Sequence, residues 1–175
     1  GLWETLNENG FRYDTSKSRA AKGGLYQWPT RNPEAGGFWD FPLAEIPFHG
    51  DFREVTVLFS GRSYRVLIGK KPMSLIHSMD YNFYANQNNI RTIDGNSSHP
   101  LKANGQFAKA LENSLAALAP VLKNEMLESY RAYFNRAYAS NRAPVHIGHH
   151  FSKWNHGIYW EAMKEFATEV CGKPD

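Results

Sequence analysis

Apolar side chains recur three or four residues apart through most of the C-terminal half, and this periodicity restricts the fold more than any other feature. Residues with this spacing share one face of an α-helix, so they predict amphipathic helices that pack on a core. We expect three such helices, over about 104–118, 120–138 and 157–170. Their apolar faces consist of Phe107, Leu111, Leu115 and Leu118, then Leu122, Met126, Tyr130 and Phe134, then Tyr159, Met163, Phe166 and Val170.

Two residues bear on where the first two helices begin. Asn104 has a side chain that accepts hydrogen bonds from free backbone N–H groups, so it is a suitable N-cap for the first helix. Pro120 has no N–H to donate, which fits the first turn of a second helix or a kink in the first. The sequence is compatible with both alternatives.

The segments before and between these helices carry strand patterns. In residues 53–60, Val55, Val57 and Phe59 alternate with other residues, as expected for a strand with one buried face. Residues 38–48 are rich in aromatic and aliphatic side chains but include two prolines, which cannot donate a hydrogen bond to a neighbouring strand. We therefore expect an irregular or edge strand there.

The remaining segments complete an alternating order of strands and helices. The patterns predict short strands at 11–14 and 145–150, loops at 15–37 and 85–103, the end of a helix at 2–9, and a strand or a helix at 72–82. Strand, long helix, strand and helix in this order predict an α/β fold. In such sheets, functional residues gather at the C-terminal ends of the strands.

Composition limits the classes of partner. The 175 residues are enough for one domain, and 42% of them are hydrophobic, which permits a packed core. With 20 basic and 17 acidic residues, the charge is nearly balanced, so no nucleic acid or anionic membrane surface is indicated as a partner. The apolar runs are too short for a membrane span. The single cysteine, Cys171, excludes an internal disulfide framework.

Four of the seven histidines lie between residues 146 and 156. His146 and His150 have the spacing of metal ligands on a helix, but on the expected strand they stand about 13 Å apart and cannot easily share one ion. We therefore assign no metal ligand among these residues. His149 and His150 point to opposite faces of that strand, so one is expected to face the mouth of the fold as a general acid or base. The alternative is one buried, hydrogen-bonded histidine and one surface histidine.

Aromatic and acidic residues supply further candidates. Trp39 and Asp40 are adjacent and match a sugar-binding platform, in which the indole covers the apolar face of a pyranose ring. The alternative is that Trp39 packs in the core. Trp154 has the same two interpretations. Asp80, Tyr81 and Asn82 follow an apolar segment, where they either line the mouth of the site, with Asp80 beside the substrate, or form a turn.

Three segments in the right order carry a resemblance to a known family. They are GFRYDTS at 10–16, GGFWDFPLAEIP at 36–47 and YASNRAPVHIGHHFSKWN at 138–155. Followed by an amphipathic helix, they resemble the second half of a polysaccharide deacetylase domain, that of the chitin and peptidoglycan deacetylases of carbohydrate esterase family four. The resemblance implies that residues 1–175 are the C-terminal portion of a distorted (β/α) barrel with seven or eight strands.

The same resemblance implies a metal-dependent hydrolysis. Members of the family remove acetyl groups from the N-acetylglucosamine units of a polysaccharide. Their metal-binding residues, an Asp pair and a His-x-x-x-His helix, lie in the first half of the domain and have no counterpart here. A divalent metal, expected to be zinc, is then held by ligands outside this chain, in the missing N-terminal half. The intact protein is expected to be exported, periplasmic or extracellular.

The resemblance also assigns roles to individual residues. An ungapped match from the SNRAP segment places the general-acid histidine at His150, whereas the family's Leu-x-His pattern places it at His149. His150 is slightly favoured, because insertions are less common inside a strand than after it. This histidine protonates the amine that leaves. Trp154 and the Trp39–Asp40 pair are then expected to line the sugar groove.

Two other functions are compatible with the sequence. One is a non-catalytic, deacetylase-like module that holds glycans through Trp39 and Trp154 without turnover. The other is a structural domain in which the aromatic and histidine side chains only pack the core. If the parent is a barrel, residues 1–175 alone expose strand edges and an apolar face, which predicts poor solubility.

Overall fold

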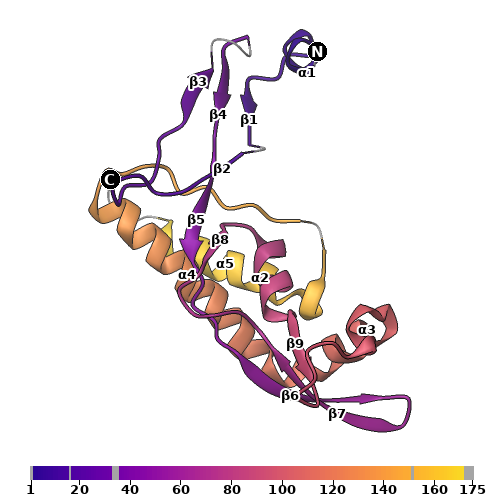
Figure 1. Ribbon diagram of the computed structural model, residues 1–175. Coiled ribbons are helices and arrows are strands. Elements are labelled where there is room, and N and C mark those ends of the chain that lie inside the picture. Colours follow the sequence, from indigo (N-terminus) through magenta and orange to yellow (C-terminus); the bar gives the residue numbers. More distant parts are fainter. Residues whose placement is uncertain (1, 16, 33–35, 151, 172–175) are drawn as a thin grey trace.

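The computed structural model describes residues 2–15, 17–32, 36–150 and 152–171. In Figure 1 the chain forms a body crossed by one long helix, and a narrower N-terminal region rises away from that body. We call this region the arm. It consists of α1 (Leu2–Glu8), β1 (Tyr13–Asp14), β3 (Thr30–Asn32) and β4 (Phe38–Asp40).

The arm is built around β4. This strand runs parallel to β1 on one side and antiparallel to β3 on the other. Gly10, with a φ of 79°, follows α1 in the left-handed conformation that the predicted helix stop requires. The prediction of a continuous loop at 15–37 is wrong in part, because β2 (Ser18–Arg19) and β3 lie within it. These strands have only two and three residues, which is too short for an alternating pattern to mark them.

A second sheet joins the arm to the body. It contains β2 (Ser18–Arg19), β5 (Leu43–Pro47) and β8 (Leu75–His77), with β5 in the middle. β5 is parallel to β2 and antiparallel to β8. The predicted irregular strand at 38–48 is observed, because this segment is divided into β4 and β5. The alternative of an edge strand is wrong, because β5, like β4, lies in the middle of its sheet. Pro42 precedes this strand and Pro47 is its last residue, so neither proline interrupts the interior of the ladder.

The predicted strand at 145–150 is reduced to one bridge. Gly148 pairs in parallel with Met79, just after β8. The Gly148 N–H donates to Ser78 O at 2.8 Å, and the Asp80 N–H donates to Gly148 O at 3.0 Å. The buried Ser78 hydroxyl extends this link, because it donates to His146 O at 2.7 Å and accepts from the Ala44 N–H. Residues 145–150 are thus held beside β8 without forming a full strand.

The third sheet is an antiparallel hairpin with one added strand. β6 (Arg53–Phe59) and β7 (Arg62–Ile68) form the hairpin, and β9 (Ile90–Ile93) pairs with β7. Val55 and Val57 are buried, which confirms the predicted strand and its inner face. The predicted loop at 85–103 is wrong, because it contains the end of α2 (Asp80–Gln87), β9 and the 3₁₀ turn η1 (Pro100–Ala103).

The predicted helices are present. α3 (Gly105–Ser114) begins after Asn104, whose side-chain oxygen accepts from the Gln106 and Phe107 N–H groups, as predicted. Pro120 lies in the first turn of a separate helix, α4 (Ala119–Ala139), which settles its two alternatives. The last helix is α5 (Ile158–Val170). The 3₁₀ turns η2 (Ala116–Leu118) and η3 (Trp154–Gly157) precede α4 and α5.

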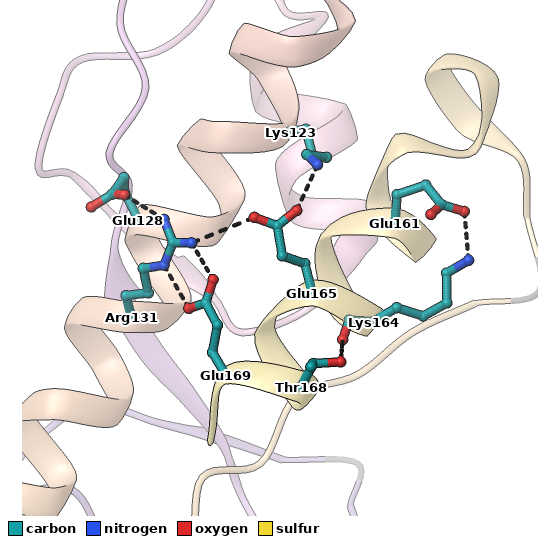
Figure 2. A network of polar contacts seen from close by, with 8 residues as sticks. All are labelled: Lys123, Glu128, Arg131, Glu161, Lys164, Glu165, Thr168 and Glu169. Carbon is teal, nitrogen blue, oxygen red and sulfur yellow. Dashed lines mark hydrogen bonds and ion pairs between the residues drawn. The ribbon is translucent and has the colours of Figure 1, made fainter. Parts of the chain in front are cut away.

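α4 and α5 pack side by side through apolar and charged contacts. Tyr130 on α4 contacts Phe166 on α5, with ring centroids 5.4 Å apart. At the solvent edge, Figure 2 shows Arg131 of α4 surrounded by Glu128, Glu165 and Glu169. Lys123 also reaches Glu165, at 2.6 Å. Ion pairs therefore connect the two helices along the solvent-exposed edge of their interface.

One hydrophobic core fills the body. Its largest fully buried side chains come from all parts of the body and include Phe48, Phe83, Phe107, Tyr130, Tyr133 and Tyr159. The described residues form three small sheets and no closed barrel. Within the same residues, no helix is long and apolar enough to cross a membrane.

Candidate functional site

Asp80 and His150 form the centre of the candidate site. Asp80 is the first residue of α2 and is fully buried. Its Oδ1 lies 2.7 Å from His150 Nδ1, and its Oδ2 accepts from the His150 backbone N–H at 2.8 Å. Because an ionised carboxylate only accepts hydrogen bonds, His150 Nδ1 is the donor and Nε2 is left on the opposite edge of the ring. The His150 side chain is 48% exposed, and its Nδ1 is the ring nitrogen turned toward the buried Asp80.

His149 approaches the same carboxylate from the interior. Its side chain is only 5% exposed, and its Nδ1 lies 3.8 Å from Asp80 Oδ2 without a hydrogen-bond partner. On the other edge, His149 Nε2 lies 3.3 Å from the hydroxyl of Tyr130. Burial lowers the pKa of His149 below its ordinary value, and the nearby His150 acts in the same direction, whereas Asp80 opposes both.

The phenol of Tyr130 is fully buried. Burial raises the pKa of Tyr130 well above its ordinary value, and the negative charge of Asp80 adds to that shift. Its hydroxyl therefore stays protonated. It forms a hydrogen bond with His149, as donor or acceptor according to the tautomer of that histidine. Of the two histidines that the sequence leaves as alternatives, only His150 has a side chain exposed to solvent.

Three aromatic rings lie beside His150, and we call them the ring cluster: Tyr81, Tyr84 and Trp154. Tyr84 and Trp154 are stacked, with centroids 5.1 Å apart and an interplanar angle of 15°. The Trp154 centroid is 5.5 Å from that of Tyr81 and 5.2 Å from that of His150. Tyr81 is 49% exposed. The cluster thus offers aromatic surface next to the exposed histidine.

The sequence indicated Trp154, and Tyr81 together with Asp80, but nothing in it indicated Tyr84. Tyr81 and Tyr84 are three residues apart, which places them on one face of a helix that starts at Asp80. That spacing has meaning only once 80–87 is known to be helical, and the sequence left 72–82 open between strand and helix.

Four residues, Gly148, His150, Trp154 and Asn155, attach the chain to α2 at three levels. At the start of the helix, Gly148 and His150 bond to Asp80. In the middle, Trp154 stacks on Tyr84. At the end, the side-chain amides of Asn155 and Asn88 bond to each other. The helix therefore acts as the support on which the site residues are placed.

Trp39 and Asp40 lie on the arm, apart from the Asp80–His150 pair. In Figure 1, β4 stands well away from α2. Asp40 is buried and forms an ion pair with Arg19, so its carboxylate is not offered to a ligand. Trp39 is 46% exposed and lines a cavity of about 300 Å³. The cavity is also lined by Asn7, Phe11, Arg12, Arg31, Gly36, Gly37 and Phe38.

His146, the other member of the His146–His150 pair, is held by backbone carbonyl groups. His146 Nδ1 lies 3.1 Å from Phe41 O and 3.3 Å from Pro42 O, which ties the segment to the start of β5. Throughout the described ranges, no group of three or more His, Cys, Asp or Glu side chains could hold a metal ion. The residues described here therefore do not fit a metal site.

Comparison of the chain with protein-family models, with curated proteins and with solved structures found no match.

Proposed function

We propose that this chain is part of a metal-dependent deacetylase that hydrolyses N-acetyl groups of an N-acetylglucosamine-containing polysaccharide, with His150 as the general acid. The observation that carries the proposal is the 2.7 Å contact between His150 Nδ1 and Asp80, at the edge of the ring cluster. An acid–base group beside aromatic rings suits chemistry on a sugar substituent. The family resemblance of the sequence points to the same reaction.

Amide hydrolysis needs an acid because a deprotonated amine is a very poor leaving group. Water adds its oxygen to the acetyl carbon and gives a proton to a base, which the resemblance places outside this chain with the metal ligands. The C–N bond then breaks, and His150, as the imidazolium, gives its Nε2 proton to the nitrogen that leaves. Return of the proton from the base to His150 completes the cycle. Acetate and the free sugar amine are the products. Asp80 keeps the imidazole in the tautomer and orientation that this transfer requires. Two backbone contacts hold Asp80 in place. The Asp80 N–H donates to Gly148 O, and Asp80 Oδ1 accepts a hydrogen bond from the Tyr81 N–H at 2.6 Å.

The resemblance assigns activation of the attacking water to a divalent metal. The described residues supply no ligand set for it. We therefore place its ligands in an N-terminal half of the domain, which becomes a partner of this chain, and derive no role for the present residues in holding it. By the same resemblance, we propose that the intact protein is exported.

The ring cluster is proposed to bind one sugar ring of the substrate. The faces of a pyranose carry C–H groups, which pack on the faces of aromatic rings. A sugar on Tyr81 and Trp154 has its substituents beside His150, because these rings lie 6.2 Å and 5.2 Å from the imidazole. Trp39, exposed on the arm, is proposed as a further contact for a longer glycan.

The test compares His150→Gln with His49→Gln in the full-length gene product. His49 is an exposed histidine outside the site, so its variant controls for loss of an imidazole. Acetate release from an N-acetylglucosamine oligomer is measured with added zinc, and binding of the oligomer is measured by calorimetry. We expect His150→Gln to lower the rate by about 10²–10⁴-fold and His49→Gln to leave it unchanged.

The outcomes separate the competing functions. Equal rates in wild type and His150→Gln would remove His150 from the reaction. Oligomer binding with no acetate release would favour the non-catalytic glycan-binding module, and neither binding nor release would overturn the proposal.

A further inference from the structure

Three consecutive residues after Trp154 adopt the left-handed conformation. Asn155 has φ 45° and ψ 47°, His156 has φ 63° and ψ 23°, and Gly157 has φ 84° and ψ 10°. Only glycine adopts this conformation without cost, so two non-glycine residues in succession are strained. Such strain persists only where surrounding contacts hold the backbone in place. The contacts of this turn therefore reveal what holds it.

Asn155 is the residue that fixes the turn. It is 2% exposed, and every hydrogen-bonding group of its side chain amide is used. Its Nδ2 donates to Asn88 Oδ1 at 3.0 Å and to Tyr159 Oη at 2.9 Å, and its Oδ1 accepts from Asn88 Nδ2 at 3.1 Å. Its backbone N–H donates to Glu112 Oε1 at 2.9 Å. Four bonds thus connect this residue to α2, α3 and α5.

The partners of Asn155 are themselves part of a buried network. The Tyr159 hydroxyl donates to Gln87 Oε1 at 2.7 Å, and Gln87 Nε2 donates to Glu125 Oε2 at 2.8 Å. Glu125 forms an ion pair with Arg53 of β6. Because these groups are buried and bonded in series, Asn155 cannot shift without leaving polar groups unpaired in the core.

We propose that Asn155 is a positioning residue, which holds Trp154 stacked on Tyr84 and so sets the ring cluster at its distance from His150. Trp154 directly precedes Asn155, so the amide that locks the turn also locks the direction of the indole. Asp80 and Asn88 lie at opposite ends of α2, which gives His150 and Trp154 one common support. The effect on sugar binding rests on the proposed function, whereas the effect on the indole does not.

The test removes the amide while keeping the backbone. Asn155→Gly favours the left-handed turn but deletes the side-chain bonds. The matched control is Asp94→Gly, which deletes a hydrogen-bonding side chain from another left-handed residue, with φ 50°. The Asp94 side chain accepts from the Arg65 backbone N–H and takes no part in the Asn155 network. Proteins labelled with 5-fluorotryptophan are compared by ¹⁹F NMR, and Trp154→Phe assigns the Trp154 signal.

In Asn155→Gly we expect the Trp154 signal to shift or broaden, while the other four of the five tryptophans keep theirs. We also expect affinity for an N-acetylglucosamine oligomer to fall about tenfold, because the rings lose their placement. Asp94→Gly should change neither property. If Asn155→Gly does not fold, Asn88→Ala removes the same amide pair from the other side and is expected to move the same signal.

An unchanged Trp154 signal in a folded Asn155→Gly or Asn88→Ala variant would overturn the positioning role. If wild type binds no oligomer, the proposed function fails, yet the ¹⁹F comparison still decides whether Asn155 holds the indole. A shifted indole with unchanged oligomer affinity would overturn the link between this turn and sugar binding.

Discussion

His149 and His150 are neighbours in sequence, yet they meet the carboxylate of Asp80 in different surroundings. The side chain of His150 is 48% exposed, whereas that of His149 is 5% exposed and contacts Tyr130 and Trp160. Burial disfavours the charged imidazolium, so it lowers the pKa of His149. The inner histidine is therefore neutral at pH 7, and its role is to pack beside Asp80 rather than to meet substrate.

This burial predicts that the free energy of unfolding depends on pH through His149. In the unfolded chain the imidazole binds a proton near its ordinary pKa of 6.5, but in the folded protein it does so only at lower pH. The unfolded state therefore binds more protons in the interval between the two pKa values. The stabilisation is complete above about pH 6.5 and declines as the pH falls toward the pKa of the folded state.

Urea unfolding at several pH values between about 7.5 and 5 measures this decline. We expect His149→Gln, which cannot titrate there, to lose a part of the pH dependence seen in wild type. His49→Gln changes an exposed histidine and should retain it. The same slope in wild type and His149→Gln would contradict burial of a neutral His149.

At the level of elements, α4 and α5 are joined by apolar contacts and by the ion pairs of Arg131 with Glu128, Glu165 and Glu169 (Figure 2). The Arg131 side chain is 31% exposed, so solvent screens its ion pairs. Exposed pairs contribute little individually, although one arginine shared by several carboxylates on two helices loses less side-chain entropy for each bond. The network is therefore expected to make a modest contribution between the helices.

A double-mutant cycle of Arg131→Met and Glu169→Gln tests that contribution. We expect a coupling free energy of about 0.5–1 kcal/mol, which decreases with added salt. Lys164→Met removes a pair that lies within α5 and is about 60% exposed, and it should change stability by less than about 0.5 kcal/mol. A coupling near zero at low salt would show that the Arg131–Glu169 pair does not contribute to joining the helices.

The same elements show how far the sequence predicts the fold. α3, α4 and α5 were predictable, because their periodic apolar faces and the cap at Asn104 are local signals. β9 was missed, because Ile90–Ile93 is extended only through pairing with β7. The strand expected at 145–150 is absent for the opposite reason. Its residues suit a strand, but only Gly148 pairs with another residue, Met79.

At the scale of the whole molecule, the candidate site depends on contacts between residues far apart in sequence. Asp80 and His150 are 70 positions apart, and Asn88 and Asn155 are 67 apart. The resemblance implied that His150 and Trp154 share one groove, but nothing in the sequence predicted the contact between His150 and Asp80. That contact depends on the core against which α2 packs, and no local pattern encodes this packing.

The arm carries two exposed aromatic residues next to each other, Tyr13 and Trp39. Tyr13 and Trp39 are register partners on the parallel strands β1 and β4, so they lie side by side, and they are 64% and 46% exposed. The central hydrophobic cluster of the described residues contains neither of them. Contiguous exposed apolar area of this kind favours association with another surface. At the whole-molecule scale we therefore predict that the chain associates with itself through the arm.

Sedimentation equilibrium over a range of concentrations tests this association. We expect the apparent mass of the 175-residue chain to rise with concentration, and Tyr13→Ser with Trp39→Ser to reduce the rise. Leu58→Ser with Val121→Ser is the matched control, because it removes exposed apolar side chains from the body and should not reduce it. None of the four substituted residues belongs to the core cluster. The free energy of unfolding of both double variants should therefore stay within about 0.5 kcal/mol of the wild-type value per substitution. A chain that stays monomeric at every concentration, or associates equally in both double variants, would show that the arm is not the surface responsible.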